Sequence, residues 1–241
     1  DNSGYQIVLN GLADEDLRVK ASALRTLGMI PFPGSANSLI GAYSFDSGQN
    51  PQWRSALISA ISNLAHKQPS LYRQILEMAE SGNADNLKKA IDFFAITVDA
   101  AAVGSILDLL NYPHLTPKDQ TILLRAIQPV MAEGNAERLI NWLDKLENPT
   151  IEVLQIGLEK IEGTKTIGGP STFTLLKNLM KSSDPDKRWI ALAVFKKQKY
   201  KDGEEWLKKF PQSGILSPVQ MRALEEAVTN QRAIREGVTP P

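Results

Sequence analysis

Cysteine is absent from the 241 residues of this chain, and histidine occurs only twice. Without cysteine the chain can form no disulfide, no thiolate metal site and no cysteine nucleophile. Two histidines also argue against a multi-histidine metal centre, and neither His66 nor His114 has a second ligand at metal-binding spacing. We therefore expect no metal and no cofactor, and no residue pattern identifies a catalytic site.

The chain also has no net charge and no long apolar run without charged residues. Lysine plus arginine and aspartate plus glutamate each number 27, so no global field draws the chain to nucleic acid or to an anionic membrane. The most apolar stretch, residues 92–110, contains Asp92, Asp99 and Asp108. A charge at the bilayer centre costs about 2.5–3.5 kcal/mol, so we predict no membrane span.

The composition is that of a globular protein, with 42% hydrophobic and 22% charged residues. The chain begins at Asp1, without an initiator methionine or a basic-then-apolar leader, and we expect a processed protein or a piece of a longer chain. The compartment is not marked. Absence of cysteine slightly favours an oxidising one, such as a bacterial periplasm, because a chain there is safer without stray thiols.

An internal repeat organises what is present. In residues 17–28, apolar or small side chains lie at Val19, Ala23 and Leu27, and a basic residue follows the first of them. The same frame returns along the chain, with its first positions at residues 19, 53, 87, 119, 153 and 187. The separations are 34, 34, 32, 34 and 34 residues. A period of this length indicates a repeat architecture.

Each repeat is predicted to be a pair of helices. Capping residues followed by proline mark the start of the second helix, because proline suits the first helical position. These pairs are Asn50-Pro51, Thr116-Pro117, Asn148-Pro149, Asp184-Pro185 and Ser217-Pro218. An apolar segment upstream of each second helix predicts the first helix. These segments are residues 7–12, 39–43, 71–78, 103–110, 139–146, 173–180 and 206–210.

The second helices resemble those of HEAT repeats, whose pattern is Asp-x-x-Val-Arg-x-x-Ala-x-x-x-Leu-Gly. The first copy matches at Asp16, Val19, Lys20, Ala23, Leu27 and Gly28. The resemblance implies an all-α fold, a right-handed α-solenoid (an α-α superhelix) of about six to seven helical hairpins over residues 1–228. Residues 229–241 are expected to form a C-terminal tail or linker. Tetratricopeptide repeats share the period of 34 residues, but their tryptophan and Gly-Tyr spacing is missing here.

The resemblance also implies a binding surface, because second helices line the concave face of such solenoids. The third and seventh positions of each frame lie opposite the predicted core, and we call them the stripe. Its candidate partner-binding residues are Arg25, Ser59, Lys89, Phe93, Arg125, Glu159 and Trp189. Cations together with exposed aromatic rings are typical of protein interfaces. The alternative for Phe93 and Trp189 is that their rings pack against the adjacent repeat. Arg54 and Arg188 are instead predicted to pair with neighbouring aspartates, and the long connection of residues 163–170 to be a mobile loop that could contact a partner.

The leading functional prediction is a non-catalytic scaffold that binds a protein or peptide on its concave surface, within a larger assembly or a larger chain. The alternative is a HEAT-like DNA-binding protein or an enzyme of the alkylpurine DNA glycosylase type, and the basic run of residues 177–209 is its only local support. A HEAT-like chromophore lyase has no residue support beyond the repeat. Nucleic acid is not the expected partner, and no small-molecule substrate is evident.

Overall fold

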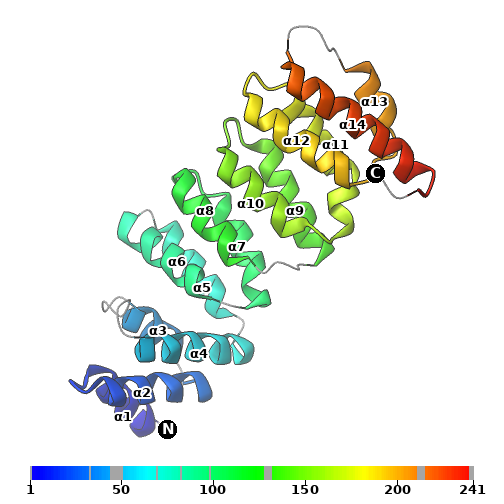
Figure 1. Cartoon of the computed structure of the whole chain (residues 1–241). Coiled ribbons are helices and arrows are strands. Elements are labelled where there is room, and N and C mark those ends of the chain that lie inside the picture. Colours follow the sequence, from blue (N-terminus) through cyan, green and yellow to red (C-terminus); the bar gives the residue numbers. More distant parts are fainter. Residues whose placement is uncertain are drawn as a thin grey trace. The chain divides into compact units, whose positions relative to one another are not determined.

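The chain is built from α-helices (Figure 1). The computed structural model describes residues 2–32, 34–43, 51–68, 70–81, 83–97, 99–127, 132–210 and 215–238. Within these ranges it has fourteen α-helices, two short 3₁₀ helices and no β-strand. The predicted all-α class is confirmed.

The helices fall into two compact units. The first unit, Asp1–Gln128, contains α1 (Asn2–Ala13), α2 (Leu17–Met29), α3 (Ser35–Tyr43), α4 (Pro51–Lys67), α5 (Ser70–Glu80), α6 (Ala84–Ile96), η1 (Ala100–Ala102), α7 (Val103–Leu110) and α8 (Pro117–Ala126). The second unit, Pro129–Pro241, contains α9 (Glu133–Lys145), α10 (Ile151–Ile161), η2 (Lys165–Gly168), α11 (Pro170–Met180), α12 (Pro185–Lys197), α13 (Gly203–Lys209) and α14 (Pro218–Arg235).

The helices alternate in the order that the repeat predicts. Each of the seven apolar segments overlaps an odd-numbered helix, α1 to α13, and each repeat frame begins in the even-numbered helix that follows. Helices two places apart in the chain contact one another within each unit. In the first unit α2 contacts α4, α6 contacts α8, and α5 contacts both α3 and α7; in the second, α12 contacts α10 and α14, and α9 contacts α11.

Capping chemistry sets most of the described helix starts. The hydroxyls of Thr116 and Ser217 accept hydrogen bonds from the backbone N–H groups of Asp119 and Gln220, and the side chains of those two residues bond back to complete capping boxes. Asp184 caps α12, also as predicted. Asn50 lies outside the described residues.

The predicted start at Asn148-Pro149 is wrong. Helix α10 begins two residues later, at Ile151, because the Thr150 hydroxyl accepts a hydrogen bond from the Val153 N–H at 3.3 Å. Conversely, Pro170 opens α11, a first helix for which no proline start was expected. A proline therefore locates a helix start here only to within about two residues.

The C-terminal segment is helical beyond the expected boundary. Helix α14 continues to Arg235, so residue 228 lies within it. Gln231 is 2% exposed. Its side chain accepts a hydrogen bond from the Tyr200 N–H at 3.1 Å and donates one to the Phe195 carbonyl at 2.6 Å. Gln231, which lies in the segment predicted to be a tail, thus connects α14 to the end of α12.

Candidate functional site: a groove between α10 and α12

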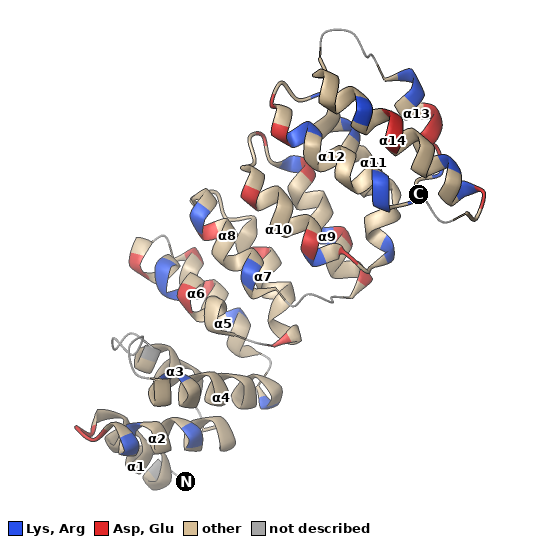
Figure 2. Ribbon diagram, viewed as in Figure 1, with Lys and Arg blue, Asp and Glu red and all other residues tan. Residues whose placement is uncertain are grey.

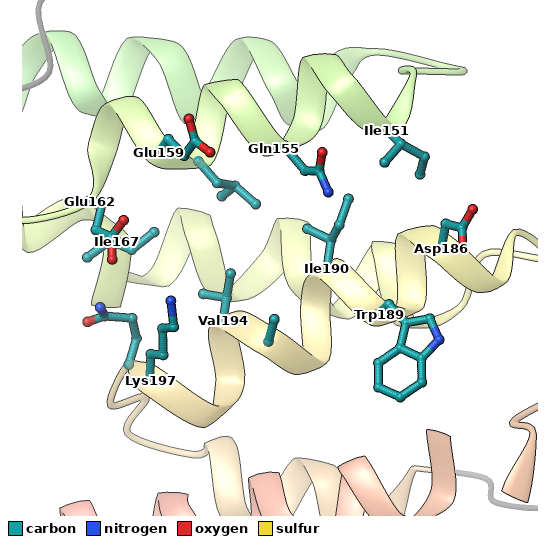
Figure 3. A pocket seen from close by; sticks show the side chains of 13 residues that line it. Ile151, Gln155, Glu159, Glu162, Ile167, Asp186, Trp189, Ile190, Val194 and Lys197 are labelled. Carbon is teal, nitrogen blue, oxygen red and sulfur yellow. The ribbon is translucent and has the colours of Figure 1, made fainter. Parts of the chain in front are cut away.

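A groove of about 750 Å³ lies in the second unit between α10 and α12 (Figure 3). It is lined by Ile151, Gln155, Leu158, Glu159, Glu162, Ile167, Asp186, Trp189, Ile190, Ala193, Val194, Lys197 and Gln198. Four of these residues are stripe positions of the fifth and sixth repeats: Gln155, Glu159, Trp189 and Ala193. The structure therefore brings two of the predicted partner-binding residues, Glu159 and Trp189, to one site.

Helical periodicity explains why these side chains share the groove. On α12, Trp189 and Ala193 are four residues apart, and Lys197 follows after four more, so all three lie on one face. The opposite face of α12 is held in the core by Phe195, whose ring is 5.9 Å from that of Trp206, centroid to centroid. With that face fixed in the core, the Trp189 side of α12 turns toward the groove.

The floor of the groove is apolar. Leu158 is 6% exposed and Ile190 is 8% exposed. Trp189 is 37% exposed and lies near Asp186 at one end of the groove, whereas Glu162, Ile167 and Lys197 gather at the other (Figure 3). Burying such apolar surface under a ligand gains roughly 25 cal/mol per Å².

A structured connection supports the Ile167 end. Residues 165–168 form η2, and the Glu133 carboxylate accepts hydrogen bonds from the backbone N–H of Lys165 at 2.9 Å and of Thr166 at 3.2 Å. These bonds, the one from Lys165 above all, hold the pKa of Glu133 below its usual value. The segment predicted as a mobile loop is thus tied to α9, and Ile167 is 6% exposed.

Carboxylates dominate the rim of the groove. Glu159, Glu162 and Asp186 are exposed, and the only cation in the lining is Lys197. None of these three carboxylates makes an ion pair with another described residue. Three negative charges against one positive leave the described rim with a charge of −2. The groove therefore combines an apolar floor with acidic groups that are not neutralised within the described part of the chain.

One cluster of charged side chains joins α13 and α14, the two helices on which Figure 2 shows red and blue segments near the end of the second unit. Glu204 on α13, with a side chain 10% exposed, lies 2.5 Å from Lys208 Nζ, 3.1 Å from Arg232 Nε and 2.7 Å from Arg235 Nη1. The hydrogen bonds from Lys208 and then Arg232 hold the pKa of Glu204 below its usual value. This cluster joins α13 to the C-terminal turns of α14.

Arg188 is structural, but its partners differ from those predicted. The residue is 7% exposed, and its guanidinium donates to the Ser182 carbonyl at 2.6 Å and to Gln220 Oε1 at 3.4 Å. The expected aspartate ladder is wrong at this position, because the Asp184 side chain caps α12 instead. Arg54, on α4, is exposed.

The remaining stripe residues belong to the first unit. Arg25, Ser59 and Arg125 are exposed on α2, α4 and α8, and Lys89 is half-buried on α6. Phe93 is 1% exposed, so the prediction that it lies on the surface is wrong. Helix α6 contacts both α5 and α8, and the Phe93 ring meets the edge of Phe94 at 6.1 Å between centroids. At this frame position the ring belongs to the core.

Part of the groove lining does not follow from the repeat frame. Ile190 and Val194 lie outside the third and seventh frame positions that define the stripe, yet they form part of the groove floor. Lys197 could have been found, since it continues the Trp189 and Ala193 spacing by one more turn. Ile167 could not, because its place depends on how η2 folds back against α9 and α11.

The described residues contain no group of three histidine, aspartate or glutamate side chains that could hold a metal ion. Nor does any helix in the described ranges combine the length and apolar character needed to cross a membrane. No protein-family model matches the chain, and no curated protein matches it.

Proposed function

We propose that this chain is a HEAT-like α-solenoid that serves as a non-catalytic scaffold and binds a protein or peptide partner in the groove between α10 and α12. The observation that carries the proposal is the convergence of Glu159 and Trp189, two partner-binding residues predicted from the repeat frame, on one groove with an apolar floor. An exposed tryptophan beside such a floor is typical of residues that dominate interface energy. The repeat period and the contacts between equivalent helices support the solenoid arrangement.

Affinity capture with a groove-blocking variant tests this function. Ala193 is exposed in the groove, and Ala193→Arg places a long cation over the floor without disturbing the core. The matched control is Ala95→Arg, which adds the same side chain at an exposed position of α6 in the first unit. Tagged wild-type and variant chains are exposed to an extract of the source cells, and captured proteins are quantified by mass spectrometry.

We expect at least one protein to be captured by the wild type and by Ala95→Arg, and to be reduced at least tenfold by Ala193→Arg. Trp189→Ala is expected to weaken capture of the same protein, because truncating an interface tryptophan commonly costs about 2 kcal/mol or more. Equal recovery by all four chains would contradict binding in this groove.

The DNA-binding alternative is distinguished by its salt dependence. Phosphate contacts produce an affinity that falls steeply with salt, whereas the rim of this groove carries more carboxylates than cations and would repel phosphate. Fluorescence anisotropy with duplex DNA at low salt is therefore expected to show no binding in the groove. A salt-sensitive affinity that Ala193→Arg changes would favour the alternative.

A further inference from the structure

The partner's chemistry can be inferred from the same groove, and this step rests on the proposed function. We propose that the groove binds an amphipathic α-helix of about three turns, with an apolar stripe flanked by lysine or arginine. The length of the groove, the state of its backbone groups and the charge of its rim each support one part of this description.

Length sets the size of the segment. The lining runs from Ile151 to Glu162 on α10 and from Asp186 to Gln198 on α12. At 1.5 Å per residue these spans are about 16–18 Å, which is the length of a helix of eleven or twelve residues. An extended peptide would place only about five residues in the same length.

The backbone of the groove favours a helix over an extended peptide. Both walls are α-helices, whose main-chain N–H and C=O groups are bonded within each helix except at the ends. The groove therefore offers no sheet edge with which an extended strand could pair, and buried strand amides would lose their hydrogen bonds. A helix satisfies its own backbone groups and can bury side chains at i, i+4 and i+7.

The floor suits such a stripe of apolar side chains. Leu158 from α10 and Ile190 and Val194 from α12 line it. Trp189 lies at one end of the groove and Ile167 at the other (Figure 3). One apolar side chain per turn of the bound helix would cover this row.

The rim sets the sign of the flanking charges. Asp186 lies at the Trp189 end, and Glu162 lies at the Ile167 end together with Lys197, so the excess of negative charge comes from Asp186 and Glu159 (Figure 3). Glu159 lies on α10 between the ends. Basic side chains that flank the apolar stripe of the bound helix could therefore pair with a carboxylate at each end of the groove. Because solvent-exposed ion pairs contribute little to affinity, these pairs select the partner and speed its association more than they tighten binding.

A displayed library of helical peptides tests the proposal without a known partner. Peptides of fourteen residues, with randomised side chains on a helix-forming background, are selected for binding to the wild-type chain and counter-selected against Ala193→Arg. The expected result is enrichment of sequences with apolar residues at i, i+4 and i+7 and with lysine or arginine beside them. Enrichment of acidic or uncharged sequences would overturn the proposal that the partner is basic. If no peptide is enriched on the wild-type chain relative to the Ala193→Arg chain, the proposal that the groove binds a helix would be overturned.

The consensus peptide from that selection is then titrated against a variant that lacks the three rim carboxylates, with Glu159→Gln, Glu162→Gln and Asp186→Asn combined. All three side chains are exposed, so the variant is expected to fold as the wild type does, which circular dichroism checks. The wild-type affinity should fall at least fivefold between 50 mM and 500 mM salt, and the affinity of the variant should change less than twofold. An equal salt dependence of both proteins contradicts recognition by these carboxylates.

The two proposals can fail separately. If Ala193→Arg removes a captured protein but the selected peptides are not basic, the groove binds a partner of different chemistry and the proposed function stands. If neither capture nor selection responds to Ala193→Arg, the proposed function fails, and the inference about the partner fails with it.

Discussion

At the residue scale, the close approach of α2 and α4 in the first unit depends on the absence of a side chain at Gly28. A Cβ atom added at Gly28 on α2 would lie 2.5 Å from the Ala60 Cα and 2.8 Å from its carbonyl oxygen on α4. Because both atoms belong to the backbone, no side-chain rotation can relieve the contact. The helices can pack at this separation only while residue 28 is glycine.

Gly28→Ala is therefore expected to destabilise the first unit, although alanine is the better helix former. Overpacking costs roughly 1–3 kcal/mol. The gain in helix propensity is at most about 1 kcal/mol. We expect the midpoint of thermal unfolding to fall by several degrees. The control is Gly41→Ala on α3, where no atom of the described residues lies within 4 Å of the added Cβ and the midpoint should stay or rise. A more stable Gly28→Ala protein would contradict the close approach.

Glu204 gives the second unit an acid-sensitive contact. Lys208, Arg232 and Arg235 surround its carboxylate, and its pKa in the folded chain is lowered below its usual value. The unfolded chain then binds a proton more readily than the folded one does. This contribution to stability is thus present above the unfolded pKa, about 4.3, and is lost as the pH falls through the folded pKa.

Glu204→Gln should remove part of that dependence. Denaturant unfolding between pH 7 and pH 3 is expected to show a lower stability at pH 7 and a smaller loss toward pH 3 than in the wild type. The matched control is Glu225→Gln on α14, where the exposed carboxylate makes no ion pair with a described residue. Parallel pH profiles for the wild type and Glu204→Gln would exclude the contribution.

At the element scale, local signals in the sequence predicted the order of the helices but not every boundary. The Thr116 and Ser217 capping boxes are contained within four residues each, so the sequence alone suffices to predict them. The end of α14 is different. Its last turns are polar and lack apolar periodicity, and their partners, Tyr200 and Glu204, lie about thirty residues earlier in the chain. Such long-range polar contacts leave no local pattern.

Deleting residues 229–241 is accordingly expected to destabilise the second unit. The deletion leaves the Tyr200 N–H without its acceptor, Gln231, and removes two of the three cations around Glu204. Each unsatisfied buried group costs about 1–3 kcal/mol. A chain ending at residue 238 is the control, because it keeps α14 whole. Equal unfolding midpoints for the two truncated chains would show that the segment after residue 228 is dispensable.

At the scale of the whole molecule, the repeat predicted which positions could form a surface but not which of them form a site. Seven residues were proposed for one stripe, and the structure places Glu159 and Trp189 in a groove of the second unit while Phe93 lies in the core of the first. The frame assigns the same role to equivalent positions. Whether the residue at such a position is buried depends on how neighbouring helices pack against its own helix, and this packing differs between α6 and α12.

The division into two compact units predicts that damage to one unit stays within it. Leu192 on α12 is fully buried, and Leu192→Ala is expected to cost about 2–5 kcal/mol. Amide hydrogen exchange, followed by mass spectrometry, should then rise at least about thirtyfold in the most protected amides of α9 to α14 and remain unchanged in α1 to α8. Gly28→Ala supplies the reciprocal measurement, with faster exchange in the first unit alone. If either substitution accelerates exchange equally in both units, their unfolding is coupled, and ligand binding between α10 and α12 would also stabilise the first unit.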